Sequence, residues 1–304
     1  MNDTVHGHMV QDLLRHRFGS HDNLICKYSS KYPVQAEREF QRLTNAYIRI
    51  LNELLKEYLP EIRDAARAER EAGQRHDDAS DLIAKVKTVF SKMTVELERR
   101  TSMFGLHSKI ESMAKLTRKL SIREWKKAVK STLGIDLMDD YYTGELYRTM
   151  MERWVEDNVA LIKTIPQESL GRMRQIVLEG YRNGETTTAI VKQIQRTYSV
   201  DRRHAQLLAR DQIAKLNGDI TQQQQQDAGV VEYVWSTPGD SRVRPSHAAL
   251  NHKRFRWDDP PVVDEKTGRR CHPGKDYQCR CCALPVFNIK TVDLPVTKGG
   301  DGRG

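Results

Sequence analysis

The apolar residues in the first half of the chain recur every three or four positions, which is the spacing of one face of an α-helix. One stripe runs from residue 40 to 58 and another from 82 to 97, and Ser80 stands where an N-cap would begin the second helix. The stripes consist of Phe40, Leu43, Tyr47, Ile50, Leu54 and Tyr58, and of Leu82, Ile83, Val86, Phe90, Met93 and Leu97. We predict two long helices that can pack as an antiparallel hairpin.

The middle of the chain predicts a set of shorter helices separated by helix-breaking residues. Pro166 and the pair Asn183-Gly184 interrupt the apolar pattern. The predicted helices cover residues 145–165, 168–181, 186–198 and 200–227. The last one contains the glutamine run 222–226, which we interpret as its solvated end because glutamine is a good helix former.

The periodicity changes after Gly229, where Val231, Tyr233 and Trp235 alternate with their neighbours as in a half-buried strand. A second short strand is expected at 283–289, and the residues between the two strands are rich in turns. The predicted fold class is therefore mainly α with a small C-terminal α+β module. Long N-terminal helices lead to a middle set of short helices and then to a loop-rich region with a two- or three-stranded sheet.

These changes of pattern divide the chain into four consecutive segments. Residues 1–34 have no clean periodicity, and we expect an arm that is partly flexible unless a partner holds it. Residues 35–148 are the expected helical domain, with a basic segment at 101–130. Residues 149–290 are the expected C-terminal module, and residues 291–304 the expected flexible tail.

Composition narrows the class of protein. The chain has 304 residues, of which 38% are hydrophobic and 30% charged, so it suits one large or two ordinary domains rather than wholesale disorder. The N-terminus lacks the profile of a secretory signal, and no apolar run reaches the roughly 18 residues of a spanning helix. We therefore expect no membrane partner and a cytoplasmic location, where cysteines stay reduced.

The formal net charge of +9 favours an anionic partner such as nucleic acid, because neutralising phosphates releases counterions. The excess is concentrated in residues 101–130, which hold eight Lys or Arg against two Glu. These residues form either the solvated face of an amphipathic helix or a contact with nucleic acid or an acidic protein. The candidate nucleic-acid-binding residues are Lys115, Arg118, Lys119, Lys126 and Lys127.

Four of the five cysteines lie between residues 271 and 282, close in sequence to two histidines. A structural zinc needs four Cys or His ligands with short spacing, and it would clamp a segment that is poor in regular structure. The candidate zinc ligands are His247, His272, Cys279 and Cys281, with Cys271 and Cys282 as spare candidates. The alternative is that the cysteines are small buried hydrophobic residues and the histidines hydrogen-bond to loops.

The same segment also permits a catalytic interpretation. If the protein is an enzyme, Asp240, Arg244, His247 and His272 could form a phosphodiesterase site, with a histidine as general base and arginine stabilising the transition state. A cysteine nucleophile, Cys279 or Cys281 beside His272, is a further option.

The structural alternative is that these residues fasten loops. Arg242 and Arg244 would then pair with Asp240, Asp258 or Asp259. Trp235 and Trp257 would be core aromatics rather than a stacking platform for bases. Arg210 and Asp211 point about 100° apart on their helix, so each needs its own partner, and we expect at least one to bond the loop that carries the arginines and His247. The residues assigned structural roles are Arg210, Asp211, Trp235, Asp240 and Arg242.

Several motifs of this region occur together and in order. The chain contains the run ARDQIAKLNGDITQQQQQDAGVVEYVWSTPGDSRVRPSHAALNHKRFRWDDPP and, further on, HPGKDYQCRCCALPV. They combine an arginine-bearing helix, a Tyr-x-Trp strand, Asp-x-Arg-x-Arg-x-x-His, a diproline and His-Pro-Gly-x-Asp-x-x-Cys-Arg-Cys. This combination, from Trp154 to Phe287, resembles the C-terminal module of the phage Mu F-like minor head proteins.

The resemblance implies a head morphogenesis protein of a tailed bacteriophage, located in the virion and, during assembly, in the host cytoplasm. It implies association with the portal protein, with major capsid or scaffold proteins, and with packaged DNA through non-specific electrostatic contacts. Such proteins act in head assembly and in retaining or delivering the genome, and no catalytic activity is expected. The alternatives are a nuclease-like phosphodiesterase and a zinc-stabilised nucleic-acid-binding protein. The resemblance does not cover the first 150 residues.

Overall fold

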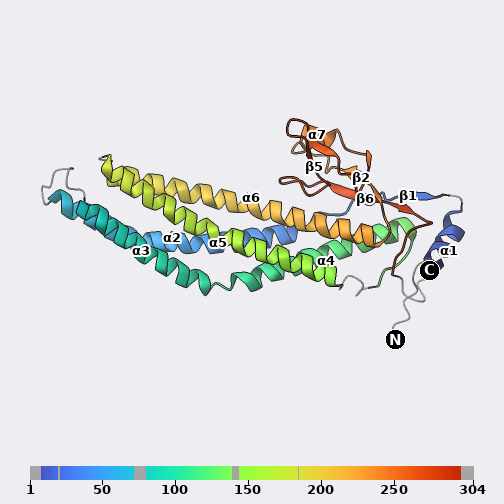
Figure 1. Cartoon of the computed structure of the whole chain (residues 1–304), viewed down its shortest axis with the longest axis horizontal. Helices are drawn as coiled ribbons and strands as arrows, with labels where there is room; N and C mark the ends of the chain where they lie inside the picture. Colours follow the sequence, from blue (N-terminus) through green and yellow to red (C-terminus); the bar gives the residue numbers. More distant parts are fainter. Residues whose placement is uncertain (1–7, 20, 72–79, 139–143, 184, 296–304) are drawn as a thin grey trace. The chain divides into compact units, whose positions relative to one another are not determined.

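The computed structural model in Figure 1 describes residues 8–19, 21–71, 80–138, 144–183 and 185–295. The chain forms two compact units, which we name the sheet unit and the helical unit. The sheet unit comprises Met1–Glu37, Met113–Trp154 and Arg210–Gly304, and the helical unit comprises Arg38–Ser112 and Val155–Ala209. Each unit is thus built from segments that are distant in sequence, unlike the four consecutive segments expected from the sequence pattern.

Helices account for most of the described residues. The long ones are α2 (Val34–Glu71), α3 (Ser80–Ser102), α4 (Leu106–Leu133), α5 (Glu145–Arg182) and α6 (Thr187–Asp227), and the short ones are α1 (His8–Phe18) and α7 (Pro245–Ala248). No helix in this part of the chain combines the length and apolarity needed to cross a bilayer.

The core of the helical unit confirms the two apolar stripes. α2, α3, α5 and α6 run side by side there (Figure 1), and their apolar faces meet in one cluster. Leu54 of α2, Met93 of α3, Met173 and Val177 of α5 and Ile190 of α6 are among its buried members. Burying each side chain of this size stabilises the fold by about 1.5–3 kcal/mol. The amphipathic spacing therefore predicted both the helices and the face they bury.

The middle helices are longer than the sequence predicted. α5 continues through Pro166, and α6 continues through residues 199 and 200 where a break was expected. A proline inside a helix costs about 3 kcal/mol, but Ile162, Ile165 and Leu170 on either side of it are buried, and their packing offsets that cost. α5 ends at Arg182, next to the expected break; Gly184 lies outside the described residues.

The sheet unit contains a four-stranded antiparallel sheet in the order β1-β6-β2-β3 and a separate two-stranded sheet, β4-β5. The predicted strands appear as β2 (Glu232–Ser236) and β6 (Cys282–Asn288). The others are β1 (Asn23–Ile25), β3 (Arg254–Arg256), β4 (Val262–Asp264) and β5 (Arg269–Arg270). The expectation of two or three strands was wrong because β1 and β3, with three residues each, are too short to show an alternation.

The N-terminal segment is part of the sheet unit. Val10 and Leu14 of α1 are buried, β1 pairs with β6, and the Cys26 backbone N–H donates to the Pro285 carbonyl at 3.0 Å. Residues 10–19 and 21–26 are therefore built into the fold, which corrects the expectation of a separate arm for this stretch; residues 1–7 and residue 20 lie outside the described part.

The C-terminal end shows the same departure from the sequence-based division. Val292 and Leu294 are buried, so the expected tail is folded at its beginning. Residues 296–304 of that tail lie outside the described part.

The glutamine run at the end of α6 also differs from expectation. Gln224 and Gln225 are each 1% exposed rather than solvated. The Gln225 side-chain amide donates to the Ala283 carbonyl at 2.8 Å, and its Oε1 accepts from the Trp257 indole N–H at 3.2 Å. Because a buried amide must be hydrogen-bonded, these bonds fasten α6 to β6 and to the residues after β3.

Substituting Leu14 with alanine tests the place of the N-terminal segment. Leu14 is 0% exposed and its neighbour Leu13 is 42% exposed. We expect Leu14→Ala to lower the free energy of unfolding by about 3 kcal/mol, because it leaves a cavity, and Leu13→Ala to change it by less than about 0.5 kcal/mol. All four tryptophans lie in the sheet unit, so urea unfolding followed by tryptophan fluorescence measures the relevant unit. Equal stability of the two variants would favour a loose arm.

Candidate functional site

Four polar side chains gather in the interior of the sheet unit. His247 comes from α7, a single turn that begins with Pro245, whose fixed φ suits the first helical position. Asp276, Cys279 and Cys281 come from the segment between β5 and β6. All four are buried, with exposed fractions of 2%, 3%, 3% and 8%.

The two ring nitrogens of His247 face different partners. Nδ1 lies 3.5 Å from the Sγ atoms of both Cys279 and Cys281, and Nε2 lies 2.9 Å from Asp276 Oδ2. A carboxylate can only accept a hydrogen bond, so Nε2 carries a hydrogen and donates the hydrogen bond to Asp276. Nδ1, the other ring nitrogen, is therefore directed at the two sulfur atoms.

Asp276 holds this arrangement. Its carboxylate also pairs with Arg244 at 2.8 Å and with Arg269 at 3.0 Å, and it accepts from the Tyr277 backbone N–H at 2.9 Å. Sequence reasoning did not select Asp276, although it is the acidic residue of the His-Pro-Gly-x-Asp motif. Its fixed position after that turn was the available signal.

The two cysteines form a hydrogen-bonded pair. The backbone N–H of Cys281 donates to the Cys279 sulfur at 3.4 Å. The hydrogen bond from the Cys281 thiol lowers the pKa of Cys279, and the same bond raises the pKa of Cys281. Cys279 is thus the member of the pair that loses its proton more readily.

His272 lies outside this cluster, so three of the four proposed zinc ligands come together and the fourth does not. Its Nδ1 is 2.8 Å from the Tyr233 hydroxyl, and it hydrogen-bonds to the Trp257 backbone. Burial lowers the pKa of His272 to about 4, which keeps the ring neutral near pH 7. Of the spare candidates, Cys282 turns toward Ser29, with its sulfur 3.6 Å from the hydroxyl, and Cys271 packs at the edge of the aromatic cluster.

The arginines form two separate networks rather than one catalytic set. Asp240 accepts from Arg242 at 2.9 Å and from both terminal nitrogens of Arg280 at 2.7 and 2.6 Å. The Arg280 guanidinium thereby holds the pKa of Asp240 well below its usual range. The predicted pairing of Arg242 with Asp240 is confirmed, whereas Arg244 pairs with Asp276 instead.

The four proposed catalytic residues are accordingly divided among different partners. Asp240 forms an ion pair with Arg280. Arg244 and His247 both bond to Asp276, and His272 hydrogen-bonds to Tyr233. A cavity of about 390 Å³ lies beside the cysteines. It is lined by Arg210, Pro238, Arg242, Val243, Arg244, His247, Tyr277, Gln278, Cys279, Arg280 and Cys281.

The helix residues Arg210 and Asp211 have separate partners, as their 100° offset requires. Arg210 pairs with Glu37 at 3.1 Å. Asp211 accepts at 3.0 Å from the backbone N–H of Gln278, a residue held at a φ of 49° next to Cys279. Asp211 thus fastens α6 to the cysteine-bearing segment, not to the loop before α7.

Trp235 packs inside the sheet unit beside the cluster. It is fully buried, its ring lies 5.4 Å from that of His247 at an interplanar angle of 88°, and Trp257 is 5% exposed. Both tryptophans are core aromatics, as the structural interpretation predicted.

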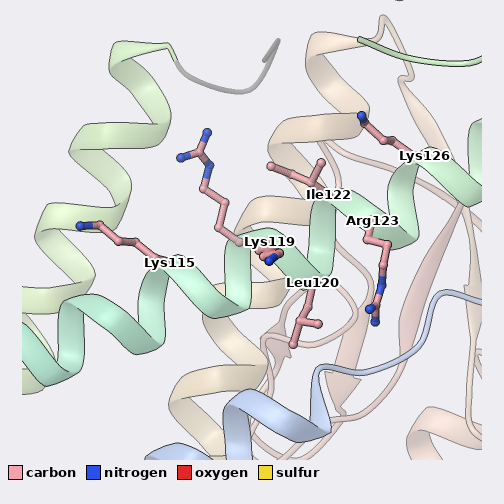
Figure 2. Close-up of a pocket in the computed structure, with 7 residues that line it drawn as sticks. Lys115, Lys119, Leu120, Ile122, Arg123 and Lys126 are labelled. Atoms are coloured by element: carbon pink, nitrogen blue, oxygen red, sulfur yellow. The ribbon is translucent and has the colours of Figure 1, made fainter. Parts of the chain in front are cut away.

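A second candidate surface lies on α4. Seven residues between positions 115 and 126 line a cavity of about 450 Å³, and Figure 2 shows their side chains extending from the helix. They are Lys115, Arg118, Lys119, Leu120, Ile122, Arg123 and Lys126. Four of the five predicted nucleic-acid-binding residues are therefore neighbours; Lys127 instead pairs with Glu124 at 3.0 Å. We name this surface the basic face of α4.

Comparison with known proteins identifies the region that contains the cluster. Residues 172–284 match the family described as Phage Mu protein F like protein. We name this matched part the Mu F-like module. The resemblance noted in the sequence is thereby confirmed, and His247, Asp276, Cys279 and Cys281 all lie inside the matched range. The basic face of α4 lies outside it.

A curated relative extends the comparison only a little. An uncharacterized protein of Haemophilus influenzae is 30% identical over 160 residues, which are 53% of this chain and 34% of that protein. The chain thus spans about a third of the length of the relative it matches. No solved structure matches the chain.

Removing the charge of Asp276 tests its role in the Mu F-like module. We expect Asp276→Asn to lower the free energy of unfolding by about 2–3 kcal/mol, because buried His247 and the partly exposed Arg244 and Arg269 lose a charged hydrogen-bond acceptor. Asp258→Asn is the matched control, since that carboxylate pairs with Arg256 at 2.7 Å but its side chain is 66% exposed. The control should lose at most about 1 kcal/mol. Urea unfolding with tryptophan fluorescence compares them; similar losses would contradict a special role for Asp276.

Proposed function

We propose that this protein is a minor head protein of a tailed bacteriophage that acts in head assembly. The observation that carries the proposal is the match of residues 172–284 to the Mu F-like family. The proposed assembly role includes the interior of the module. There, hydrogen bonds and ion pairs join α7 and α6 to the segment that carries Cys279 and Cys281.

The side-chain arrangement supports a non-enzymatic role. A hydrolase needs an acid or base within reach of a reacting group, but Asp240 is engaged by two guanidinium groups and His272 is buried and neutral. His247 donates a hydrogen bond from Nε2 to Asp276, and its Nδ1 faces two sulfur atoms. A nuclease-like phosphodiesterase therefore receives less support than the assembly role.

Partners follow from the proposed role. A minor head protein acts among the portal protein, major capsid or scaffold proteins and packaged DNA, and so is located in the virion and, during assembly, in the host cytoplasm. We propose the portal as its main protein partner and the genome as its nucleic-acid partner, with a role in retaining or delivering the genome.

The basic face of α4 is the part of the chain best suited to contact DNA. Five Lys or Arg side chains line it and no acidic side chain does. Lys119 and Arg123 are exposed. Ala114, Thr117 and Trp125 of the same helix are buried, so these two basic side chains are directed away from the core. A single-sign surface without base-reading geometry favours phosphate contacts that do not depend on sequence.

The salt dependence of DNA binding tests this contact. We expect the double variant Lys119→Gln/Arg123→Gln to bind duplex DNA more weakly, and the slope of log affinity against log salt to become less steep by about 1 to 2, because each lost phosphate contact reduces it by about 0.9. Lys85→Gln/Lys87→Gln on α3 removes the same charge from exposed positions and should leave the slope unchanged. Equal slopes for both variants would contradict a contact through α4. The intact DNA should remain uncleaved with magnesium, manganese or zinc.

Association with the portal tests the assembly role directly. When the chain is co-expressed with the tagged portal protein of its own phage, we expect the two to co-purify at a salt concentration that removes DNA. A tagged portal protein from an unrelated phage is the control. The proposal would be contradicted if the chain does not bind the tagged portal protein and is also absent from assembled heads.

A further inference from the structure

We propose that His247, Cys279 and Cys281 bind one zinc ion through Nδ1 and two Sγ atoms, and that the fourth position is taken by an exchangeable ligand from the adjoining cavity. The inference does not depend on the proposed function, because it concerns the interior of the module alone. It differs from the set expected from the sequence by leaving out His272.

The spacing of the three donor atoms fits tetrahedral zinc. Zinc lies about 2.0–2.1 Å from imidazole nitrogen and about 2.3 Å from thiolate sulfur, so the nitrogen–sulfur edge of a tetrahedron is about 3.6 Å. His247 Nδ1 is 3.5 Å from each sulfur. All three donor atoms lie within 4.8 Å of one another, on side chains that are buried together. The tetrahedral sulfur–sulfur edge is about 3.8 Å, so the two sulfur atoms need to approach each other by at most about 1 Å to receive the ion.

The surroundings of His247 match those of a metal-bound imidazole. A histidine ligand usually donates its other ring N–H to a carboxylate, which fixes the tautomer and directs the free lone pair at the metal. Asp276 accepts this bond from Nε2 at 2.9 Å, and Arg244 and Arg269 hold the carboxylate in place.

The surroundings of Cys279 also suit a thiolate. Backbone N–H groups of Cys281 and Gly274 donate to its sulfur. Gly274 has a φ of 83°, a conformation that favours glycine, and its Cα region packs against Gly218 of α6. The turn that supplies this donor therefore requires glycine, and it stabilises negative charge at the position where the metal would bind.

The donor set selects zinc among the common ions. Two thiolates and one imidazole suit zinc, whereas magnesium and calcium prefer oxygen ligands. Three protein ligands leave one tetrahedral position open. His272 cannot fill it, because its ring is bonded to Tyr233 and to the Trp257 backbone.

The cavity of about 390 Å³ supplies the remaining ligand. His247, Cys279 and Cys281 all line it, together with Arg210, Arg242, Arg244 and Arg280. A water molecule can therefore reach the metal and take the fourth position. The ion would clamp α7 to the start of β6 across a segment with little regular structure.

Metal analysis and cobalt substitution of the full chain test the site. We expect about one equivalent of zinc in protein purified without chelators and supplied with zinc, as one tetrahedral site requires. The cobalt-substituted wild-type protein should show visible bands of tetrahedral cobalt and near-ultraviolet sulfur-to-cobalt charge transfer. Azide should shift the visible bands, because it can displace the exchangeable ligand. Less than about 0.3 equivalents of zinc, absent charge transfer, or bands insensitive to azide would overturn the proposal as stated.

Cysteine variants locate the ligands. Cys279→Ser and Cys281→Ser should each lose most of the zinc, and Cys282→Ser should keep it, because Cys282 turns toward Ser29 although it adjoins Cys281. The cobalt spectrum of the wild-type protein tests the site even if a ligand variant fails to fold. Equal zinc content in Cys281→Ser and Cys282→Ser, or loss of zinc from Cys282→Ser alone, would assign the metal elsewhere.

Discussion

The buried charge of Asp276 is the constraint on which the interior of the Mu F-like module depends. A carboxylate with a 1% exposed side chain must be compensated, since an unpaired buried charge costs several kcal/mol. Its compensation comes from α7 through His247, from the loop before α7 through Arg244, and from β5 through Arg269. Three segments that share little hydrophobic surface are thereby fixed around one side chain.

Strand β2 distributes the aromatic packing around this centre. Tyr233 and Trp235 are two residues apart and therefore lie on the same face of the strand. Tyr233 packs against Trp257 and His272, and Trp235 packs against His247. The two aromatic residues of this strand face thus contact different histidines. His272 is a neutral hydrogen-bonded residue of the core, whereas His247 lies against the cysteines.

Periodicity predicted what depends on local sequence. The apolar stripes around Leu54 and Met93 identified long helices, and the alternation at Tyr233 and Trp235 identified β2, because burial of one face is recorded in the spacing. Pro166 was misleading, since tertiary packing outweighs the cost of a proline inside a helix. The strand β1 could not be predicted because three residues hold no period.

The sequence predicted which types of residue form the candidate metal site, but not which of them lie close enough together to share an ion. His247, Cys279 and Cys281 were selected from their residue types, yet His272 was grouped with them because it is close in sequence. Only the fold shows that the ring of His272 is bonded to Tyr233. Asp276 was overlooked although it stands in the His-Pro-Gly-x-Asp motif, because the sequence does not show that its carboxylate is buried and pairs with His247, Arg244 and Arg269.

The hydrogen bond between α1 and the residues that follow β6 has a consequence for biosynthesis. The Gln11 amide donates to the Val292 carbonyl although the two residues are 281 positions apart. At a ribosomal rate of about 5–20 residues per second, the N-terminal helix waits roughly 15 to 60 seconds for this partner. Strand β1 likewise has no partner until β6 has been synthesised, so both N-terminal elements stay accessible to chaperones during that interval.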